Sequence, residues 1–246
     1  MSGVKPFLLL ATRPEDEAAD DEYAGFLQAG ALAPSELRRV RLESAPMPPI
    51  DLAEFSGVIV GGSPFNASDP SEKKSEIQRR VEREIGDLLD EIVEEDFPFL
   101  GACYGIGPVT SHLGGVVDGS WPEVPGPTRV TLTSEGLADP LFGMMAPSFE
   151  AYVGHKEACA VLPDGGALLA SGQACPVQAF RVRQNLYITQ FHPELTRESL
   201  ITRLRVYRNH GYFHPDQIDG LIQSLGSSTV EEPARLLKAF VERFAV

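Results

Sequence analysis

Gly101-Ala102-Cys103-Tyr104-Gly105 directly follows the apolar run Phe97-Pro98-Phe99-Leu100, and this junction decides the fold. The pattern predicts a short buried strand, a sharp turn and then a helix, with the side chain at the apex left exposed. Glycines two residues before and two residues after Cys103 give such a turn steric room. The alternative is a buried cysteine in a glycine-rich turn, since free cysteine is among the most buried residue types. On the first interpretation, Cys103 is a candidate nucleophile.

A second segment, Tyr187 to Glu194, has the pattern of a strand that runs into a turn. His192 and Glu194 are two positions apart, and residues at that spacing point to the same face of extended backbone. Pro193 fixes its own φ and biases His192 away from helical backbone. One imidazole and one carboxylate can therefore reach the same place.

A thiol nucleophile needs a base, and the base needs a group that orients it. Cys103, His192 and Glu194 supply these three roles in that order. A carboxylate on one ring nitrogen would fix the tautomer and stabilise the imidazolium. An imidazolium beside the sulfur favours the thiolate, which is the reactive form. We therefore expect three side chains that are far apart in the chain to converge at one cleft.

With these residues identified, the chain resembles the class I glutamine amidotransferases, the family with a Cys-His-Glu triad. The order of its motifs is similar to that in the glutaminase domain of GMP synthase. The elbow together with Gln-Phe-His-Pro-Glu is a specific signature, and the likeness spans residues 55–195. Three blocks carry it: the elbow and its helix through Leu113-Gly114-Gly115, the segment from His155 through Leu162-Pro163 to Gln190-Phe191-His192-Pro193-Glu194, and the stretch Val58-Ile59-Val60-Gly61-Gly62-Ser63-Pro64.

The resemblance implies an α/β fold with an open, mostly parallel, twisted sheet and helices on both faces, that is, a flavodoxin-like three-layer glutaminase fold. It also implies hydrolysis of the glutamine γ-carboxamide through a thioester on the catalytic cysteine, with no metal and no organic cofactor. By the same resemblance, the backbone N–H groups of Gly62 and Tyr104 would form the oxyanion hole. Gly61, Gly107 and His155 would contact the substrate.

The first hundred residues alternate between strand and helix patterns, which predicts a parallel sheet covered on both faces. From Ile77 to Ile92, apolar residues recur at helical spacing. The predicted strands are Phe7–Ala11, Val40–Leu42, Gly57–Val60 and Phe97–Leu100, and the predicted helices are Glu15–Ala29 and Lys73–Glu95.

The proline-rich residues 121–127 predict a loop, and residues 128–133 predict a strand. Residues 166–190 contain two or three short strands, and helical spacing returns over 199–207, 215–225 and 232–244. No internal repeat or low-complexity linker divides the chain. We therefore expect one domain over residues 1–246, with a core at 1–195 and a helical C-terminal extension at 196–246.

The chain has 246 residues and a formal net charge of −14. That charge argues against binding to nucleic acid and to anionic membranes, and no apolar stretch approaches the length of a bilayer span. Three irregularly spaced cysteines argue against a disulfide framework and fit a reducing cytoplasm. Cys159 and Cys175 have apolar neighbours and are interpreted as packing residues, and no spacing of Cys and His is typical of zinc.

Two positions depart from the family pattern. The family usually has Gln two residues after the second elbow glycine, where this chain has Gly107. The missing side chain leaves either a roomier pocket or a weaker glutamine site. The GMP synthase relatives carry Gly-Asp after the histidine that corresponds to His155, where this chain has Lys156 and Glu157. That change is either drift in a loop or a sign of an altered substrate or partner.

The sequence contains no pattern of a nucleotide-dependent synthetase, since Gly61-Gly62-Ser63-Pro64 lacks the lysine and the spacing of a phosphate loop. The first hypothesis is therefore a free-standing glutaminase that supplies ammonia to a separate synthase subunit. The second is a self-sufficient hydrolase or peptidase for another γ-glutamyl compound, which Gly107 would suit. The third is a catalytically silent homologue that binds a partner, and the intact triad argues against it.

Overall fold

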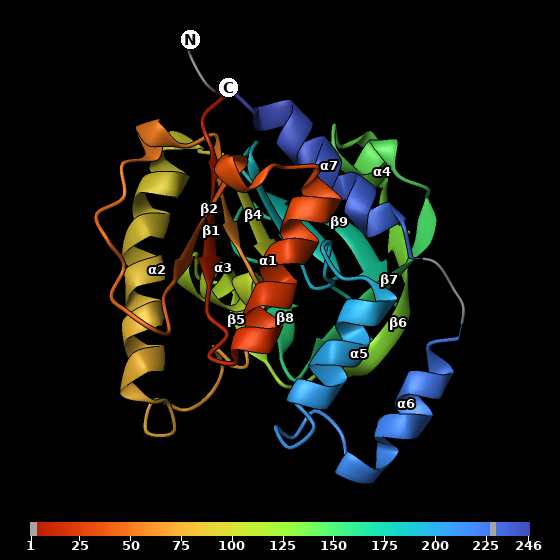
Figure 1. Cartoon of the computed structure of the whole chain (residues 1–246). Coiled ribbons are helices and arrows are strands. Elements are labelled where there is room, and N and C mark those ends of the chain that lie inside the picture. The colour runs from red at the N-terminus through yellow and green to blue at the C-terminus, as the bar shows by residue number, and fades with distance from the viewer. Residues whose placement is uncertain (1–3, 227–229) are drawn as a thin grey trace.

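The computed structural model describes residues 4–226 and 230–246, and in these residues nine strands form one twisted sheet (Figure 1). With two further strands outside this sheet, the described residues contain β1 (Phe7–Ala11), β2 (Leu37–Arg41), β3 (Gly57–Val60), β4 (Phe99–Ala102), β5 (Val116–Asp118), β6 (Glu123–Leu132), β7 (Ser148–His155), β8 (Ala158–Val161), β9 (Ala167–Gly172), β10 (Ala179–Val182) and β11 (Leu186–Thr189). Their order in the sheet is β2-β1-β3-β4-β11-β10-β9-β6-β7, while β5 and β8 pair separately as an antiparallel ribbon.

Five adjacent strands of the sheet, from β2 to β11, run parallel to one another. The remaining four strands, β10, β9, β6 and β7, are joined antiparallel. The predicted open, mostly parallel sheet is therefore confirmed, with an antiparallel extension on one side. In such sheets ligands bind beyond the carboxyl ends of the parallel strands, which is where β4 and β11 lead into the candidate triad residues.

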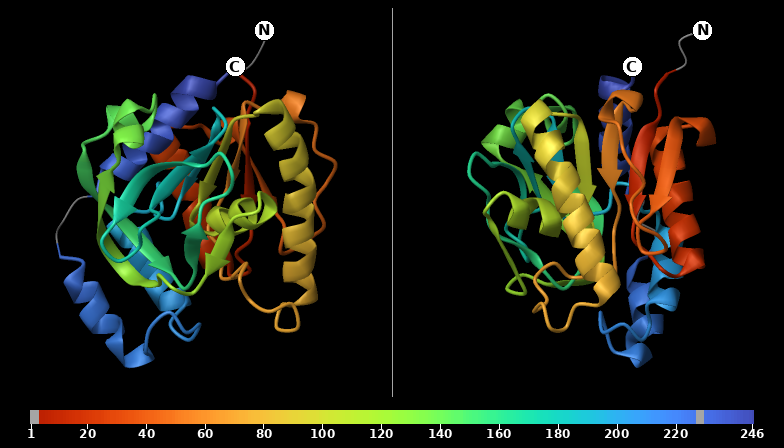
Figure 2. Two further views of the ribbon diagram at one scale, coloured as in Figure 1. Left: turned by 180° about the vertical axis from the view of Figure 1, so that it is seen from behind. Right: turned by 90° about the vertical axis from the view of Figure 1, so that its left-hand side faces the viewer.

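Helices cover both faces of the sheet, so the structure has three layers (Figure 2). Helices α1 (Asp16–Gly30) and α7 (Glu232–Phe244) pack on one face, and α2 (Glu76–Glu95) and α3 (Ile106–His112) pack on the other. The other helices are α4 (Ser134–Ala138), α5 (Arg197–Val206) and α6 (Ile218–Ser224), and short 3-10 turns lie at Pro34–Glu36, Leu52–Glu54, Cys103–Gly105, Phe142–Met144 and Pro215–Gln217.

Strand β1 shows how one sheet serves two apolar cores. Phe7 and Leu9 belong to the apolar cluster that contains Phe240 of α7. Leu8 and Leu10 belong to the cluster on the opposite face, which is formed with α2 and α3. Because successive residues of a strand point to opposite faces, a strand covered on both sides is apolar throughout, as β1 is.

Helix α2 begins at Glu76, three residues later than the predicted start at Lys73. The side chain of Ser75 accepts a hydrogen bond from the Gln78 N–H and so caps the first turn. The apolar stripe of α2 is buried as predicted, except that Ile77 is 46% exposed. Ile77 lies in the first turn, where the helix extends past the strands (Figure 1).

Strand β6 begins at Glu123, inside the proline-rich stretch that was predicted to be a loop. Its register with β7 shifts between Glu123 and Gly126, so Pro125 lies at an irregularity of the ladder. Proline lacks an N–H, and a strand tolerates it where the ladder is interrupted. The predicted loop at 121–127 is therefore wrong from Glu123 onward, whereas the strand predicted at 128–133 is part of β6.

Other boundaries differ from the predictions by a few residues. Strand β2 ends at Arg41 and begins at Leu37 rather than Val40, and β4 extends to Ala102. Strands β5, β7 and β8 were not predicted, while β9, β10 and β11 account for the strands expected within 166–190. The three helices expected near the C-terminus are present, with residues 215–217 forming a 3-10 turn. Within the described residues, no helix combines the length and apolarity that crossing a bilayer requires.

The first described residues and the C-terminus lie together at one end of the sheet (Figure 1). The Lys5 N–H donates to the Val246 carbonyl at 2.7 Å, and the Val246 N–H lies 3.2 Å from the Ser56 hydroxyl. Helix α7 packs against α1 and contributes Phe240 to the main apolar cluster. The last part of the expected C-terminal extension is therefore part of the core packing.

Candidate active site

Cys103 occupies the apex of the turn between β4 and α3. Its φ is +52°, in the left-handed region that L residues enter only with strain. A Cβ on Gly101 would lie 3.3 Å from the Cα of Gly105, so the two sides of the turn approach closely at Gly101, whereas a Cβ on Gly105 would make ordinary contact with Val60 at 3.5 Å. A strained apex between a strand and a helix is the geometry of a nucleophile elbow.

His192 and Glu194 follow β11, which is the parallel neighbour of β4. Thr189 at the end of β11 pairs with Ala102 at the end of β4, so both strands end at the same edge of the sheet. Nδ1 of His192 lies 2.8 Å from Oε1 of Glu194. The structure therefore brings the imidazole and the carboxylate together beside Cys103, as their sequence positions predict.

Cys103 and His192 line the same hollow, and the thiol lies close enough to the ring to influence its pKa. Burial by itself would lower the pKa of His192, but the Glu194 carboxylate and Cys103 outweigh burial and raise that pKa to about 9. The imidazolium is therefore the favoured form of His192 at neutral pH. A protonated base beside a cysteine is the arrangement that nucleophilic cysteines use.

Arg203 of α5 adds a second cation to the site, and no sequence motif marked it. Its Nη2 donates to Oε1 of Glu194 at 2.9 Å, and its Nη1 lies 3.0 Å from Nδ1 of His192. Burial would raise the pKa of Glu194, but His192 and Arg203 outweigh it and hold that pKa well below its ordinary range. Glu194 is therefore ionised and can stabilise the imidazolium.

A buried ion pair, Arg13 with Glu22, lies against the Gly61-Gly62 turn. Oε1 of Glu22 accepts from Nε of Arg13 at 2.8 Å and from the Gly62 N–H at 3.0 Å. A Cβ on Gly62 would collide with the Arg13 guanidinium and lie 2.8 Å from Cε1 of His192, so only glycine fits this position. The Gly62 N–H, which the resemblance assigns to the oxyanion hole, donates to Glu22 in this structure.

Gly61 was expected to contact the substrate and Tyr104 to form the oxyanion hole, and the two residues differ in their surroundings. The Gly61 N–H donates to the Leu10 carbonyl at 3.1 Å, and a Cβ on Gly61 would lie 2.6 Å from Oε2 of Glu22. Gly61 therefore packs against the buried ion pair. Tyr104 is the second residue of the 3-10 turn Cys103–Gly105, and the first N–H groups of a helical segment lack intrahelical acceptors. Its N–H is the better candidate of the two expected oxyanion donors.

Cys103 lies in the wall shared by two hollows. Ser63, Gly154 and Tyr212 line both of them. The first, here called the polar hollow, is lined also by Asn66, Lys156, Glu157 and Gln190. The second, here called the apolar hollow, is lined also by Val153, Leu195, Leu200, Leu204 and Phe213, together with Arg13 and Arg203.

Tyr212, from the segment between α5 and α6, lines both hollows together with Cys103. Its hydroxyl donates to the Ser63 carbonyl at 3.4 Å, and Nζ of Lys156 lies 4.3 Å from its ring centroid. Lys156 also donates to the His210 carbonyl at 2.7 Å. Cys103 is only 8% exposed, so the predicted exposed apex is wrong in this structure, where Tyr212 of a later segment lines both hollows beside it.

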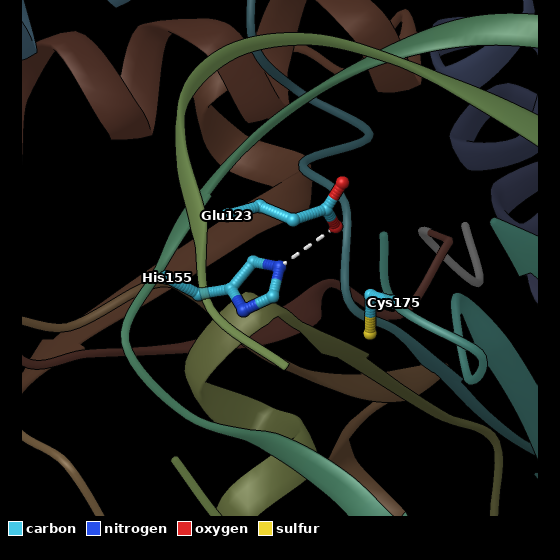
Figure 3. Close-up of side chains that lie close together, drawn as sticks. All are labelled: Glu123, His155 and Cys175. Carbon is cyan, nitrogen blue, oxygen red and sulfur yellow. Dashed lines mark hydrogen bonds and ion pairs between the residues drawn. The ribbon is translucent and has the colours of Figure 1, made fainter. Parts of the chain in front are cut away.

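His155, Glu123 and Cys175 form a buried cluster whose residue types are those of metal ligands (Figure 3). Their atoms are already paired: Nε2 of His155 lies 3.0 Å from Oε2 of Glu123, and Oε2 also accepts from Gln178 at 2.6 Å. The Cys175 thiol donates to the Val177 carbonyl, and burial raises the pKa of Cys175 to about 12. A metal would need the thiolate, so this cluster fits a hydrogen-bonded network better than a metal site.

This network places His155 at the polar hollow without leaving its ring free for a substrate. Nδ1 of His155 lies 3.0 Å from the Glu157 carbonyl. The last residue expected to contact substrate, Gly107, lies on α3 beside Ala67 and Glu157. Glu157, which the sequence marked only as a departure from the family, lines the polar hollow itself.

Three charged residues of the site, Arg13, Glu22 and Arg203, were not predicted. One of them carried a signal in the sequence: Glu22 stands at helical spacing between Ala18 and Phe26, which are buried on the same stripe of α1. A charge inside an apolar stripe needs a buried partner. Arg203 carried no such signal, because it gains its role only from the position of α5 against Glu194 in the fold.

Comparison with known proteins assigns the chain to a family. The model of the family described as "Glutamine amidotransferase class-I" matches residues 35–204. The matched region contains Cys103, His192 and Glu194 and ends before Tyr212.

Two relatives carry the name GMP synthase. The glutamine-hydrolyzing GMP synthase of Petrotoga mobilis (strain DSM 10674 / SJ95) is 27% identical over 150 residues, which cover 59% of this chain and 26% of that protein. A protein of Natronomonas pharaonis, named as one subunit of a glutamine-hydrolyzing GMP synthase, is 34% identical over 101 residues, covering 41% of this chain and 54% of that protein. The chain thus spans about a quarter and about half of the lengths of these relatives.

Solved structures show the same fold. A glutamine amidotransferase from Thermotoga maritima matches with a TM-score of 0.76 and 17% identity over 98% of both chains. Another from Methylobacillus flagellatus matches with a TM-score of 0.72 and 16% identity, covering 99% of this chain and 96% of that chain. The predicted α/β glutaminase fold is therefore confirmed. On the family match, which covers more than half of its residues, the chain belongs to the class I glutamine amidotransferase family.

Proposed function

We propose that this chain hydrolyses the γ-carboxamide of glutamine, with Cys103 as the nucleophile. The observation that carries the proposal is that Cys103 and His192 line one hollow, with Nδ1 of His192 lying 2.8 Å from Glu194. A nucleophile, a base and a group that orients the base are the parts that acyl transfer requires. Family membership supports the reaction class, and the names of two relatives describe them as glutamine-hydrolyzing.

The first half of the reaction forms a thioester. The Cys103 thiolate attacks the γ-carbonyl carbon, and the electron pair of the C=O bond moves to oxygen. The Tyr104 N–H donates to that oxyanion, and the Gly62 N–H joins it only if its peptide turns away from Glu22. The C–N bond then breaks, the His192 imidazolium gives its proton to the leaving nitrogen, and ammonia departs.

The second half releases glutamate. Water attacks the γ-glutamyl thioester while His192, now neutral, takes a proton from it. The C–S bond breaks and the thiolate leaves next to the restored imidazolium. Glu194 holds Nδ1 of His192 throughout, and Arg203 keeps Glu194 ionised. The cycle returns each group to its starting protonation state.

We infer further that the ammonia serves a separate synthase. The relative from Natronomonas pharaonis is named as one subunit of its glutamine-hydrolyzing GMP synthase, which supports a division of the two reactions between chains. The nearly closed cover over Cys103 is consistent with this, because ammonia released under a cover can be passed on before it mixes with solvent. The acceptor is then a substrate of the partner chain.

The apolar hollow favours a second candidate function. Its lining contains Val153, Leu200 and Phe213 beside Cys103, whereas Lys156 and Glu157 line only the polar hollow. A γ-glutamyl amide with an apolar amine would place its acyl part in the polar hollow and its leaving group in the apolar hollow. Such a substrate would make the chain a γ-glutamyl hydrolase that needs no synthase.

Ammonia release tests the proposed function. We expect the purified chain to release ammonia from glutamine and Cys103→Ala to abolish that release. Cys159→Ala is the matched control, since Cys159 is a fully buried thiol with no place in the site, and it should keep the activity. Intact-mass analysis after rapid quenching should find the γ-glutamyl adduct on the wild type and not on Cys103→Ala.

Two results would overturn the proposal or redirect it. Ammonia release that survives in Cys103→Ala would exclude the thioester route. Turnover of γ-glutamyl benzylamide at a higher kcat/KM than glutamine would favour the second candidate. Co-purification of a synthase from cells would support the transfer of ammonia to another chain, and the captured synthase would identify the acceptor.

A further inference from the structure

Gly62 is an expected oxyanion donor, but both of its backbone groups already have partners. Its N–H donates to Oε1 of Glu22 at 3.0 Å, and its carbonyl accepts from the buried Thr12 hydroxyl at 3.3 Å. Turning this N–H toward the sulfur would take a donor away from a carboxylate that is 0% exposed, which is unfavourable. Of the two donors that the family resemblance implies, Tyr104 is then the one whose N–H remains available.

Arg13 places another donor beside Gly62. Its Nε donates to Oε1 of Glu22 at 2.8 Å and its Nη1 donates to the Tyr207 hydroxyl at 3.1 Å, whereas its Nη2 donates to no acceptor in the part of the chain that the structure describes. A Cβ built on Gly62 would collide with Nη2 and would lie 2.8 Å from Cε1 of His192. The unused nitrogen of the guanidinium, the glycine and the His192 ring therefore meet at one point.

Arg13 also borders the space in which the reaction would take place. It lines the apolar hollow together with Cys103 and His192, although it is only 4% exposed. Its bonds to Glu22 and Tyr207 fix the guanidinium before a substrate arrives. Donors that are held in advance stabilise developing charge without having to reorganise, and a guanidinium adds a permanent positive charge.

We propose that Arg13 is a catalytic residue whose Nη2 donates a hydrogen bond to the oxyanion that forms when the Cys103 thiolate attacks an acyl carbon. It takes the place that the resemblance assigns to the Gly62 N–H, with the Tyr104 N–H as the second donor. When sulfur adds to the carbon, the electron pair of the C=O bond moves to oxygen, and Nη2 keeps its proton while it bonds to that oxygen. No proton is gained or lost by Arg13, so His192 remains the group that transfers protons.

The assignment rests on the proposed function for the identity of the substrate. It does not depend on glutamine for its test, because every acyl group that the Cys103 sulfur accepts passes through an oxyanion. A guanidinium in this hollow can also have another role, which is to favour the thiolate form of Cys103. The experiment has to separate these two roles.

Two reagents that react with the same sulfur separate them. 4-Nitrophenyl acetate acylates Cys103 through an oxyanion, whereas iodoacetamide alkylates it by displacement at a saturated carbon and forms none. A change in the thiolate population alters both rates, and loss of an oxyanion donor alters the first rate alone. Cys103→Ala, treated in the same way, measures the background from Cys159 and Cys175.

Arg13→Lys keeps the positive charge and a donor for Glu22, but it lacks the fork that reaches Tyr207 and Gly62 at the same time. We expect acylation by 4-nitrophenyl acetate to slow by about 10-fold or more and alkylation by iodoacetamide to stay unchanged. With glutamine, kcat should fall by about 100-fold, as it does when one oxyanion donor is removed. KM should change little, because the bond exists only in the transition state and the intermediate.

Arg39→Lys is the matched control, since Arg39 pairs with Asp20 at the surface, and it should change none of these rates. Tyr207→Phe is the second variant, because it removes only the hydroxyl that accepts from Nη1 and leaves Arg13 paired with Glu22. It should show the same selective loss of acylation to a smaller extent. Thermal denaturation reports whether each variant folds, and Tyr207→Phe decides the question if Arg13→Lys does not.

Three results would overturn the assignment. Equal losses in acylation and alkylation would place the effect of Arg13 on the sulfur. Unchanged acylation in folded Arg13→Lys, or in Tyr207→Phe if Arg13→Lys does not fold, would exclude a role in the chemistry. A raised Kd for glutamine when Arg13→Lys is added to Cys103→Ala, with acylation intact, would show that Arg13 binds the substrate instead.

The same measurements distinguish this inference from the proposed function. A wild type that releases no ammonia from glutamine, but whose acylation depends selectively on Arg13, would overturn the proposed hydrolysis and keep the oxyanion role. Ammonia release that depends on Cys103 but not on Arg13 would keep the hydrolysis and overturn the oxyanion role.

Discussion

Arg203 donates from Nη2 to Oε1 of Glu194 at 2.9 Å, and Nδ1 of His192 faces that same oxygen at 2.8 Å. One carboxylate oxygen therefore serves two cations when His192 is protonated. The Arg203 guanidinium helps to keep Glu194 ionised. It also repels the His192 imidazolium and competes with it for the Glu194 carboxylate. Arg203 is thus a positioning residue that limits how basic His192 becomes.

Replacing Arg203 by Met should move the alkaline limb of the pH profile. We expect the pKa of His192 to rise, because its imidazolium loses a neighbouring cation and gains a larger share of Glu194. The kcat/KM for glutamine, measured from neutral to alkaline pH, should then decline at a higher pH than in the wild type. At neutral pH we expect a loss of about 10-fold, since Glu194 is less firmly held.

Arg203→Lys is the companion variant, because it keeps the charge and loses the fork of donors. Its alkaline limb should stay near that of the wild type. A profile of unchanged shape in Arg203→Met, with only its height reduced, would contradict an electrostatic role for Arg203.

The triad residues should differ in the size of their effects. His192→Ala should lower kcat for glutamine nearly as much as Cys103→Ala does, by about 10⁴-fold or more, because nucleophile and base act as a unit. Glu194→Ala should be milder, since the ring can still take the proton without its orienting partner. Single-turnover ammonia release measures all three, and equal losses would count against an orienting role for Glu194.

The pH dependence of stability follows from the raised pKa of His192, about 9 against an ordinary value of 6.5. The folded chain holds this proton more tightly than the unfolded chain does. The stabilising contribution is therefore complete below pH 6.5 and is lost as the pH rises through about 9. Urea denaturation should show the free energy of unfolding falling across this window. The same fall in His192→Gln would assign it to other groups.

Glu22→Ala should destabilise the fold strongly. Glu22 is 0% exposed and pairs with buried Arg13, so its removal leaves a buried guanidinium without its partner. Breaking one side of a buried ion pair costs about 3–5 kcal/mol, which chemical denaturation can measure. Asp20→Ala on the same helix is the control, because Asp20 pairs with Arg39 at the surface and such pairs contribute about 0–1 kcal/mol. Similar losses for both variants would disprove the structural importance of the buried pair.

Gly107→Ala should destabilise the chain and weaken substrate binding. The added Cβ would lie 2.6 Å from the Cβ of Ala67, and overpacking of this kind costs about 1–3 kcal/mol. We expect the KM for glutamine to rise as Glu157 is displaced. Gly86→Ala is the control in another helix, since its nearest neighbour would be 3.7 Å away and Ala is favoured over Gly by about 1 kcal/mol in a helix. Thermal denaturation should show opposite shifts, and equal behaviour of the two variants would contradict the close packing at Gly107.

The strand, turn and helix around Cys103 were predictable, because an apolar run and two glycines within two residues of the apex form one local pattern. The placement of His192 beside Cys103 also follows from local pattern, once parallel neighbours β4 and β11 end at one edge. Strand β6 was only partly predicted, because its prolines are tolerated at an irregularity of its pairing with β7. That pairing cannot be read from residues 121–127 alone.

The charges around the triad were not predictable in the same way. Arg203, Glu22 and Arg13 come from separate elements, and none lies in a motif. Their roles arise from distances of 2.8 to 3.0 Å that only the packed elements create. The position of Tyr212 was not predictable for the same reason, since its hydroxyl donates to the carbonyl of Ser63, a residue distant in the chain.

The sequence by itself determined the candidate nucleophile, base and orienting carboxylate and the order of strands and helices around them, because these depend on short-range backbone preferences and spacing. Only the tertiary structure decided which cations share Glu194, that the Gly62 N–H bonds to Glu22, and that Glu157 fills the space beside Gly107. Those features are contacts between segments that are distant in the chain. No local pattern encodes them, because each exists only once the packing of the whole fold has brought its two sides together.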